Sequence, residues 1–536
     1  MLKKIPINNF NQLKICEPAV GSGMFIRTLL EVLYENVNPK YERIDKDIFK
    51  NIFGVDIDPN ACHATKLSLS LLHLLIYDEI PTNLNIINSE SIEYLSKNYQ
   101  NSFDILISNP PFVRYDSTNS EHIKEYLGDL AIGKTDLYLG FLKLALEILK
   151  PDGYGLFVLP HSFLVNKSAS QIRKLIFDLA NISFIADLSA IHVFGDINSY
   201  IILLIFQKKS LAPKTYDNPI KLRCKNSVGQ ALEDTLNNIQ TSSENYSIYQ
   251  GQEIDFGKNE WFVLPPAEYI IEQKFQNFPA IDKFLKVNSG VITGADTIFI
   301  INRLAIPKGE ENIYKQFLSD RKITSYKIYE DIEDYIFYPF ENGFHLSAED
   351  IEKKYPKTWK YLLSHKEQLE SRKSLPKEWW MLRSTSHPDN ILIPKIVNHE
   401  LTITPKFSFD NEGDFIVSHS SYLSLKSNDY DLELLYYFLG ILNSTPCYWY
   451  ISTHSNKYGS GYNKIQPKTL KNTPIPDPFK IDKKDLLILI KLVKERFNQN
   501  EESILQIEKE IDLLVCSLYG LTNEESQILL GSWQET

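Results

Sequence analysis

One segment of the sequence, Ser108-Asn109-Pro110-Pro111-Phe112, places two carbonyl acceptors and an aromatic ring directly after an apolar run. The side-chain carbonyl of Asn109 and the main-chain carbonyl of Pro110 can each accept one N–H bond of an amine on an aromatic ring. Because proline restricts the backbone, the main-chain carbonyl of Pro110 keeps a fixed direction. An amine held in this way points its lone pair at an electrophile, and no strong base is required. We therefore predict that Asn109, Pro110, Pro111 and Phe112 are catalytic, with Phe112 stacking on the base that carries the amine.

A glycine-containing turn lies earlier, at Glu17-Pro18-Ala19-Val20-Gly21-Ser22-Gly23, and also follows an apolar run. Glycines between a strand and a helix permit a tight turn and let a ligand approach the backbone closely. Two glycines do not complete a dinucleotide fingerprint, so the turn alone does not identify the ligand. We predict that it lines a cofactor site through Glu17, Pro18, Ala19, Gly21 and Gly23.

Acidic and polar residues follow the next two apolar runs. Asp56 and Ile57 follow the second run, where a carboxylate can accept hydrogen bonds from ribose hydroxyls. Asp58 is expected to cap the following helix instead. Glu90 and Ser91 follow the third run, where a polar side chain can reach the amine of an adenine ring. These positions extend the predicted cofactor site.

Alternating apolar runs and amphipathic segments must position these motifs. Seven runs have the length and composition of buried strands: 13–16, 52–55, 84–87, 103–108, 155–159, 182–188 and 200–206. Four segments have helical patterns: 25–35, 60–77, 136–149 and 169–179. Strands that alternate with helices predict an α/β fold with a doubly wound, mostly parallel sheet. Ligands bind such sheets at the carboxyl ends of the strands, where the motifs above lie.

Together these motifs resemble the S-adenosylmethionine-dependent amino-methyltransferases, whose order and spacing they follow. Asn109 comes about 88 residues after Gly21. The segment Lys134-Thr135-Asp136-Leu137-Tyr138 and the turn Leu149-Lys150-Pro151-Asp152-Gly153 are similar to those of bacterial DNA adenine methyltransferases. In that family an aromatic side chain near His192-Val193-Phe194-Gly195 walls a flipped base. The resemblance therefore implies a Rossmann-like catalytic domain, S-adenosylmethionine as cofactor, and Phe112 and Phe194 around a flipped adenine.

The second half resembles the target-recognition domain of Taq-like methyltransferases from restriction–modification systems. The similar stretches are Ser289-Gly290-Val291-Ile292-Thr293-Gly294-Ala295-Asp296, Leu439-Gly440-Ile441-Leu442-Asn443-Ser444, Gly461-Tyr462-Asn463-Lys464-Ile465-Gln466-Pro467 and the tail 507–525. Cofactor motif, catalytic motif and recognition domain in this order define the gamma group. We expect a catalytic domain over residues 1–210, a mixed α+β recognition domain over 211–480 and a C-terminal helical segment over 481–536.

Local charge is consistent with double-stranded DNA as partner, although the net charge is −11. Residues 351–384 hold nine Lys or Arg against four acids, interleaved with aromatic rings. Such mixtures suit phosphate contacts and stacking, although each basic run can also be a solvated face. The candidates for DNA contact are Lys357, Lys360, Arg372, Lys373, Arg383 and Lys464.

Composition narrows the alternatives. Five scattered cysteines without C-x-x-C spacing argue against a disulfide framework or a metal site, and the absence of a long apolar stretch argues against a membrane span, so we expect a cytoplasmic protein. Pro446-Cys447 superficially matches the nucleophile of cytosine-C5 methyltransferases but lies far from the fourth predicted strand. The sequence shows no cluster of carboxylates of the kind that a nuclease active site needs, so we do not expect this chain to cleave DNA.

Two other functions stay open. They are N4-methylation of cytosine and a catalytically silent DNA-recognition subunit of a larger modification complex. The family usually carries a further motif before the glycine turn, and only 12 residues precede the first predicted strand. We therefore expect an upstream segment or a partner chain to complete the cofactor pocket.

Overall fold

A computed structural model describes residues 12–36, 46–113, 121–133, 135–190, 200–224, 242, 246–252, 256–257, 260–328, 331–341, 343–385, 388, 391–418, 420–458, 462–497 and 501–531. The chain divides into two compact units, with the main boundary at Pro266. Within the described ranges, no helix is both long and apolar enough to cross a membrane.

The first unit is built on one sheet with the strand order β3-β2-β1-β4-β5-β7-β6-β8-β9. Strands β1 to β5 are parallel to one another, and β7 is antiparallel to both β5 and β6. Its strands are β1 (Ile15–Glu17), β2 (Ile52–Asp56), β3 (Asn85–Asn88), β4 (Phe103–Ser108), β5 (Leu149–Pro160), β6 (Ala180–Asp187), β7 (Ile201–Lys208), β8 (Ile220–Cys224) and β9 (Tyr246–Gln250). The predicted α/β class and the mostly parallel sheet are therefore confirmed.

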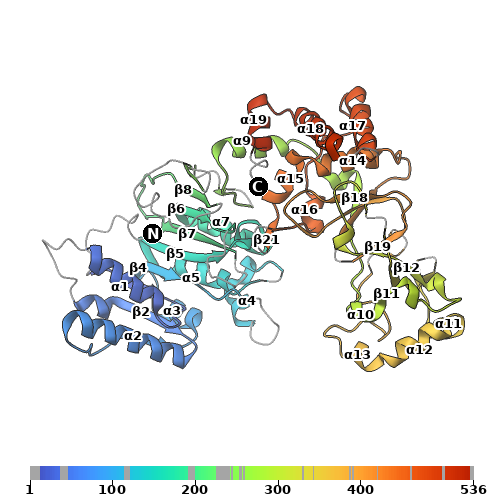
Figure 1. Ribbon diagram of the computed structural model, residues 1–536. Helices are drawn as coiled ribbons and strands as arrows, with labels where there is room; N and C mark the ends of the chain where they lie inside the picture. The colour runs from blue at the N-terminus through green and yellow to red at the C-terminus, as the bar shows by residue number, and fades with distance from the viewer. Residues whose placement is uncertain are drawn as a thin grey trace. The chain divides into compact units, whose positions relative to one another are not determined.

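Helices accompany this sheet, and Figure 1 shows α1, α2 and α3 beside its first three strands. They are α1 (Met24–Asn36), α2 (Pro59–Tyr77), α3 (Ser91–Asn98), α4 (Glu121–Leu127), α5 (Tyr138–Ile148), α6 (Ser162–Val165) and α7 (Ser170–Leu179). The four predicted helices correspond to α1, α2, α5 and α7, with ends that differ by at most two residues. Local interactions explain why α2 begins at Pro59. The side chain of Asp58 caps the first turn, and proline fits the first helical position because the N–H of that position has no partner within the helix.

Apolar composition explains why these segments form the core. All but the last residue of β7, Ile-Ile-Leu-Leu-Ile-Phe-Gln-Lys, are buried, as expected for a strand covered on both faces. The sheet also continues past residue 210, because β8 pairs with β6 and β9 pairs with β8. The expected domain boundary at 210 therefore falls inside this unit. Strands β8 and β9 are short and carry polar residues at alternate positions, which is a weak signal in sequence.

The second unit mixes small sheets with helices. Its sheets have the orders β10-β20-β16-β18, β11-β13-β12-β19, β14-β15 and β17-β22-β21. Its strands are β10 (Leu285–Ser289), β11 (Ile300–Asn302), β12 (Tyr314–Leu318), β13 (Asp334–Phe337), β14 (Phe340–Glu341), β15 (Phe344–His345), β16 (Lys395–Asn398), β17 (Leu401–Thr402), β18 (Phe407–Asp410), β19 (Phe415–Val417), β20 (Ser421–Leu425), β21 (Asn456–Tyr458) and β22 (Tyr462–Lys464).

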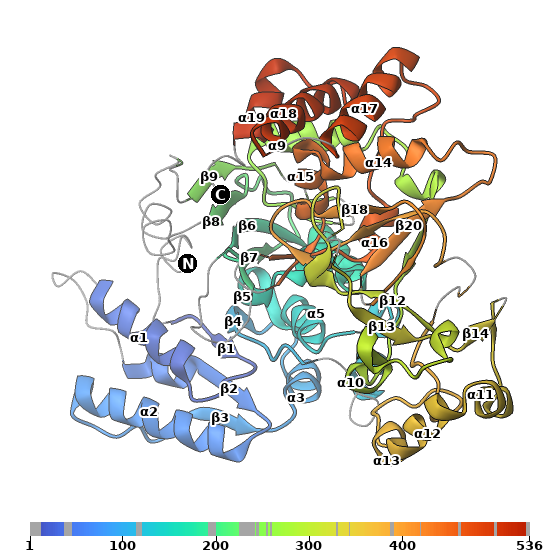
Figure 2. The same ribbon diagram turned by 45° about the vertical axis from the view of Figure 1, so that its right-hand side comes forward.

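Helices gather at two ends of this unit, with α17, α18 and α19 at one end and α11, α12 and α13 at the other (Figures 1 and 2). The helices are α9 (Pro266–Phe275), α10 (Asp296–Phe299), α11 (Ala348–Lys354), α12 (Pro356–Ser364), α13 (Lys366–Glu370), α14 (Leu434–Asn443), α15 (Thr445–Thr453), α16 (Pro467–Lys471), α17 (Lys483–Arg496), α18 (Glu501–Leu518) and α19 (Asn523–Gly531). The expected helices after residue 481 are present, and they belong to the same compact unit as the sheets.

Candidate functional site

The glycine turn after β1 is held in a conformation that requires its glycines. Gly21 and Gly23 have φ angles of +52° and +77°, which side chains rarely tolerate. A Cβ on Gly23 would also lie 2.8 Å from Cγ2 of Thr65 in α2. The hydroxyl of Thr65 in turn donates to the carbonyl of Gly21 at 2.9 Å. The backbone of this turn therefore packs tightly against α2.

Glu17 ends β1 beneath this turn and is 1% exposed. Its Oε2 is buried and finds no hydrogen-bond partner among the described residues. Burial raises the pKa of Glu17 well above its ordinary value; the backbone N–H of Ile26 opposes this rise and the nearby Asp56 adds to it. A buried acceptor without a donor is costly, so this oxygen marks a place where a ligand donor or cation fits.

Asp56 ends β2 and faces the same turn. Its Oδ2 accepts the backbone N–H of Gly21 at 2.8 Å, and its Oδ1 accepts the N–H of Asp58 at 3.0 Å. A carboxylate has about four acceptor sites, so both oxygens can still accept a ribose hydroxyl. The next side chain, Ile57, is 73% exposed and offers an apolar surface beside the carboxylate. The structure thus brings Glu17, Gly21 and Asp56 together.

Glu90 and Ser91 follow β3, but the Glu90 carboxylate is already engaged. It caps α3 by accepting the backbone N–H groups of Ile92 at 3.2 Å and Glu93 at 2.6 Å. Ser91 is buried at 6% exposure. The structure therefore gives Glu90 a capping role in addition to its predicted contact with the cofactor.

Asn109 follows β4 and supplies the second buried acceptor of the site. Its Oδ1 is buried and has no hydrogen-bond partner among the described residues. Pro110 is buried, and Pro111 and Phe112 are half-buried. The parallel pairing of β1 with β2 and β4 puts the ends of these strands at one edge of the sheet. Asn109 therefore lies at the same edge as Glu17 and Asp56.

An aromatic cluster adjoins the Asn-Pro-Pro segment. The rings of Phe112 and Tyr138 have centroids 6.3 Å apart at an angle of 85°, and Tyr138 meets Phe163 at 6.3 Å in a similar edge-to-face arrangement. The backbone also joins these segments, because the N–H of Leu137 donates to the carbonyl of Val113 at 3.1 Å. The other predicted wall residue, Phe194, lies outside the described residues.

His161 and Asp187 form a further polar pair at this edge that the sequence patterns did not identify. His161 Nε2 lies 3.6 Å from Asp187 Oδ2, and both side chains are largely buried. Their positions in the sequence could have indicated the pair, because each residue lies at the end of an apolar run that forms a strand of the sheet.

Four of the six cations predicted to contact DNA have exposed side chains. They are Lys357, Lys360, Lys373 and Arg383. Lys357 Nζ donates to the carbonyl of Lys308 at 2.8 Å. Lys360 lies on α12, whose first turn is held by the carboxylate of Glu310. Their exposure is compatible with a phosphate-binding role.

Arg372 and Lys464 are placed differently. The guanidinium of Arg372 donates to the backbone carbonyls of Leu369, Thr293, Met381 and Trp379 at 2.6 to 3.1 Å. Lys464 is half-buried, and its ammonium lies 3.4 Å from Glu400. The structure thus engages Arg372 in holding the backbone of its own unit, a role that its position in a basic run did not reveal.

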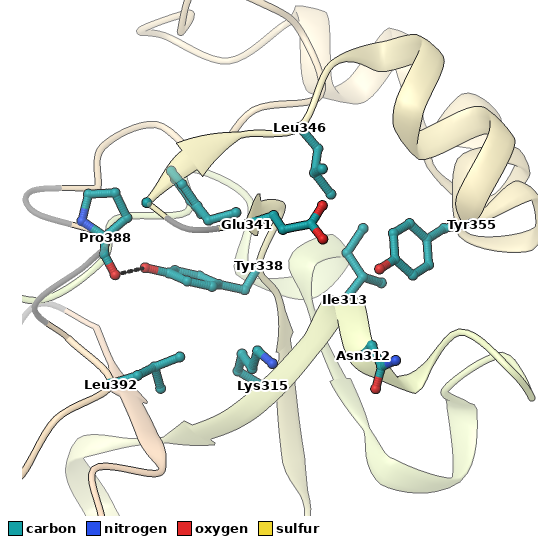
Figure 3. Close-up of a pocket in the computed structure, with 11 residues that line it drawn as sticks. Asn312, Ile313, Lys315, Tyr338, Glu341, Leu346, Tyr355, Pro388 and Leu392 are labelled. Atoms are coloured by element: carbon teal, nitrogen blue, oxygen red, sulfur yellow. Dashed lines mark hydrogen bonds between the residues drawn. The ribbon is translucent and has the colours of Figure 1, made fainter.

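A pocket of about 450 Å³ lies in the second unit (Figure 3). Lys315 of β12, Glu341 of β14 and the rings of Tyr338 and Tyr355 line it. Tyr338 donates to the carbonyl of Pro388 at 3.2 Å. None of the predicted DNA-contact residues lines this pocket.

Cys447 can be set aside as a nucleophile. It lies in α15 of the second unit and is fully buried. Burial raises the pKa of its thiol to about 12, and the side-chain hydrogen bond with Tyr519 opposes this only partly. The thiolate is the nucleophilic form, so this environment disfavours cytosine-C5 chemistry.

Comparison with known proteins finds a matching family within each of the two units. Residues 50–194 match the Eco57I restriction-modification methylase family, and residues 343–475 match the TaqI-like C-terminal specificity domain. The Type II methyltransferase M.BstVI of Geobacillus stearothermophilus is 23% identical over 97% of this chain and 93% of its own. M.BanIII of Aneurinibacillus aneurinilyticus is 24% identical with the same coverage.

A solved structure shares the fold. The Type IIL restriction-modification enzyme MmeI, determined in complex with DNA, aligns with a TM-score of 0.66 and 12% identity over 98% of this chain and 73% of its own. With the glycine turn, the acid after β2 and the Asn-Pro-Pro segment all in place, the chain is an S-adenosylmethionine-dependent, site-specific DNA methyltransferase of the restriction–modification type with a TaqI-like C-terminal specificity domain.

Proposed function

We propose that the chain methylates the N6 amine of adenine within its recognition site. The observation that carries this proposal is the buried, unpartnered Oδ1 of Asn109 directly after β4. A buried acceptor without a partner among the described residues suits the amine of a base that leaves the duplex. No hydrogen bond within the protein has to be broken before the amine can bind. The aromatic ring at Phe112 supplies a stacking surface for the extruded base.

Asn109 and Pro110 act by positioning. Each carbonyl accepts one N–H of the amine, which pulls the nitrogen toward tetrahedral geometry and exposes its lone pair. S-adenosylmethionine, when bound, supplies an electrophilic methyl group. Glu17, the Gly21 turn and Asp56 hold it at the neighbouring strand ends, with Asp56 on the ribose and Ile57 against the adenine ring.

N4-methylation of cytosine needs the same amine geometry and is the second candidate. The choice of Asn109, where N4-specific enzymes more often have Ser or Asp, supports adenine. The experiment is base-resolved sequencing of DNA from cells that express the chain, with mass analysis of the digested nucleosides. N6-methyladenine at one short sequence supports the proposal. N4-methylcytosine refutes it, and DNA with no new methylated base favours a silent recognition subunit.

For DNA contact we propose Lys357, Lys360, Lys373 and Arg383. Their exposure in the specificity domain supports phosphate contacts, which position the duplex and carry no sequence information. The measurement is the salt dependence of DNA affinity in single alanine variants. Loss of one phosphate contact lowers the slope of log affinity against log salt by about one.

We also propose that a further segment, or a partner chain, covers the methionine end of the cofactor. An apolar side chain beside the glycine turn, Met24, is 58% exposed, which supports a cover. The test is methyl incorporation by the purified 536-residue chain. Robust turnover with micromolar cofactor affinity would refute the proposal, whereas activity restored by a cell extract fraction would support it.

A further inference from the structure

His161 and Asp187 lie at the sheet edge that carries Asn109, one on each side of β7. His161 directly follows β5, and Asp187 is the last residue of β6. In the antiparallel pairing, the last residues of β5 and β6 oppose Ile201 and Ile202 at the start of β7. The two side chains therefore meet across the beginning of that strand, where Nε2 of His161 lies 3.6 Å from Oδ2 of Asp187.

Asp187 is ionised in this setting. Burial would raise the pKa of its carboxyl, but the facing His161 and hydrogen bonds from Ser189 hold that pKa below its ordinary value. The backbone N–H of Ser189 donates to Oδ1 at 2.9 Å, which leaves Oδ2 for the histidine. A carboxylate beside one ring nitrogen keeps the proton on that nitrogen, so Nε2 carries the hydrogen of the neutral ring.

The other ring nitrogen, Nδ1, takes no part in this contact. Nδ1 of His161 is buried and finds no hydrogen-bonding group among the described residues, although the whole side chain is only 5% exposed. A neutral imidazole with hydrogen on Nε2 has a lone pair on Nδ1. The contact with Asp187 therefore orients the ring so that the buried Nδ1 keeps a lone pair that accepts no hydrogen bond from the described residues.

This nitrogen belongs to the catalytic edge. Ser108 of β4 pairs with Phe157 of β5, and Phe112 and His161 each come four residues later in the chain, past the ends of these strands. Tyr138 links the two segments, because its ring lies against Phe112 on one side and against Phe163, two residues after His161, on the other.

The amine-positioning groups create a need for such a nitrogen. After methyl transfer the amine carries one proton too many, and the carbonyls of Asn109 and Pro110 are too weakly basic to keep it. We propose that His161, oriented by Asp187, accepts this proton through Nδ1. The inference rests on the proposed amine methylation.

The step balances without a further reactant. The lone pair of the target amine forms a bond to the methyl carbon, and the methyl–sulfur bond breaks with its electron pair remaining on sulfur. The surplus proton leaves the amine for Nδ1, directly or through a water. The resulting imidazolium is stabilised by the Asp187 carboxylate and loses its proton to solvent during turnover.

Few other ionisable groups face this pair among the described residues. Tyr138 of α5 packs against Phe163, two residues after His161, and burial raises the pKa of its hydroxyl, so it stays neutral. Tyr200 precedes β7 and accepts the His161 backbone N–H through its carbonyl at 2.7 Å. Arg173 of α7 donates to the carbonyls of Phe163 and Asn166. The charged group in contact with the His161 imidazole is therefore the Asp187 carboxylate.

Two substitutions separate the roles of the ring nitrogens. His161→Gln places an amide donor near the position of Nε2 and keeps the Asp187 contact, but it removes Nδ1. His161→Asn places an amide near Nδ1 and loses the Asp187 contact. The experiment uses the full chain and a duplex that contains the site found by sequencing. It measures the single-turnover methylation rate, DNA affinity and the fluorescence of 2-aminopurine at the target position.

We expect His161→Gln and His161→Asn each to lower the rate at least about tenfold, because neither amide accepts a proton, with DNA affinity, the 2-aminopurine signal and thermal stability unchanged in His161→Gln. His73→Gln is the matched control, because His73 is also buried and its Nδ1 is hydrogen-bonded to the carbonyl of Glu79, away from the strand ends that carry Asn109 and His161. A wild-type rate in His161→Gln overturns the inference. Equal losses of rate in both variants, together with lowered thermal stability, would also overturn the inference. They would mean that the contact between His161 and Asp187 only stabilises the fold. If cells that express the wild-type chain contain no new methylated amine, the proposed function fails first.

Discussion

The carboxylate of Asp56 accepts a hydrogen bond from the backbone N–H of Gly21 at 2.8 Å, which ties the end of β2 to the turn after β1. Asp58, two residues later, instead accepts from Asn60 at 2.9 Å and caps α2. Two nearby carboxylates thus have different tasks. Asp56 holds the glycine turn in place, and Asp58 stabilises a helix.

We predict that Asp56→Ala weakens S-adenosylmethionine binding at least about tenfold, because each hydrogen bond to a charged group contributes roughly 1.5–3 kcal/mol. Titration calorimetry measures the affinity. Asp58→Ala is the matched control, which should cost about 1 kcal/mol of stability through the lost cap and leave cofactor affinity unchanged. Equal affinities in wild type and Asp56→Ala would remove Asp56 from the site.

Asn109→Ala should lower the methylation rate by about a hundredfold or more while DNA and cofactor affinities stay near those of wild type. The amide orients the amine in the transition state, and loss of one preorganised group at such a site costs roughly two to three orders of magnitude. Single-turnover kinetics and separate binding titrations provide the readout. A variant with wild-type rate would contradict the amine-positioning mechanism.

Phe112→Ala should weaken capture of the extruded base by about fivefold to 150-fold, because stacking contributes roughly 1–3 kcal/mol per base. The measurement is affinity for a duplex whose target base is unpaired, compared with an ordinary duplex. Phe112→Tyr keeps the ring and serves as the control. If the alanine variant binds both duplexes like wild type, Phe112 does not stack on the base.

Arg372→Ala and Lys373→Ala should affect different properties. The Arg372 guanidinium holds four backbone carbonyls, so its removal should lower the free energy of unfolding by about 2 kcal/mol or more. Lys373 is exposed, and its loss should leave stability unchanged and reduce the salt slope of DNA binding by about one. Denaturant unfolding and DNA titrations at several salt concentrations test both. A stability loss in Lys373→Ala, or none in Arg372→Ala, would reverse the assignment.

Asp512 predicts a pH dependence of stability. Burial raises the pKa of its carboxyl to about 6, against hydrogen bonds from Thr445 that act in the opposite direction. The folded state then binds the proton more tightly than the unfolded state, so stability is greatest below the unfolded pKa of 3.8 and falls as pH rises to about 6. The penalty above that pH is on the order of 2–3 kcal/mol.

Asp512→Asn should remove this pH-dependent part, because an amide does not ionise. We expect the difference in unfolding free energy between variant and wild type to shift in favour of the variant from pH 4 to pH 8. Denaturant unfolding at the two pH values measures it. A difference that does not change with pH would mean that Asp512 titrates normally.

The sequence by itself determined the α/β class, the alternation of strands and helices in the first unit, and the residues of the glycine turn and the Asn-Pro-Pro segment. These features follow from local causes. Buried strands need continuous apolar runs, helices need amphipathic periodicity, and turns with positive φ need glycine. The cap at Asp58 was predictable for the same reason, since its side chain reaches only its own helix.

Tertiary structure decided what depends on distant partners. The backbone contacts of Arg372 reach Thr293, which lies 79 residues away, so a basic run in the sequence could not distinguish it from the exposed Lys373. The pairing of His161 with Asp187 depends on how β5, β7 and β6 align. Strand register and side-chain burial arise when segments far apart in the chain pack together, and no local pattern records them.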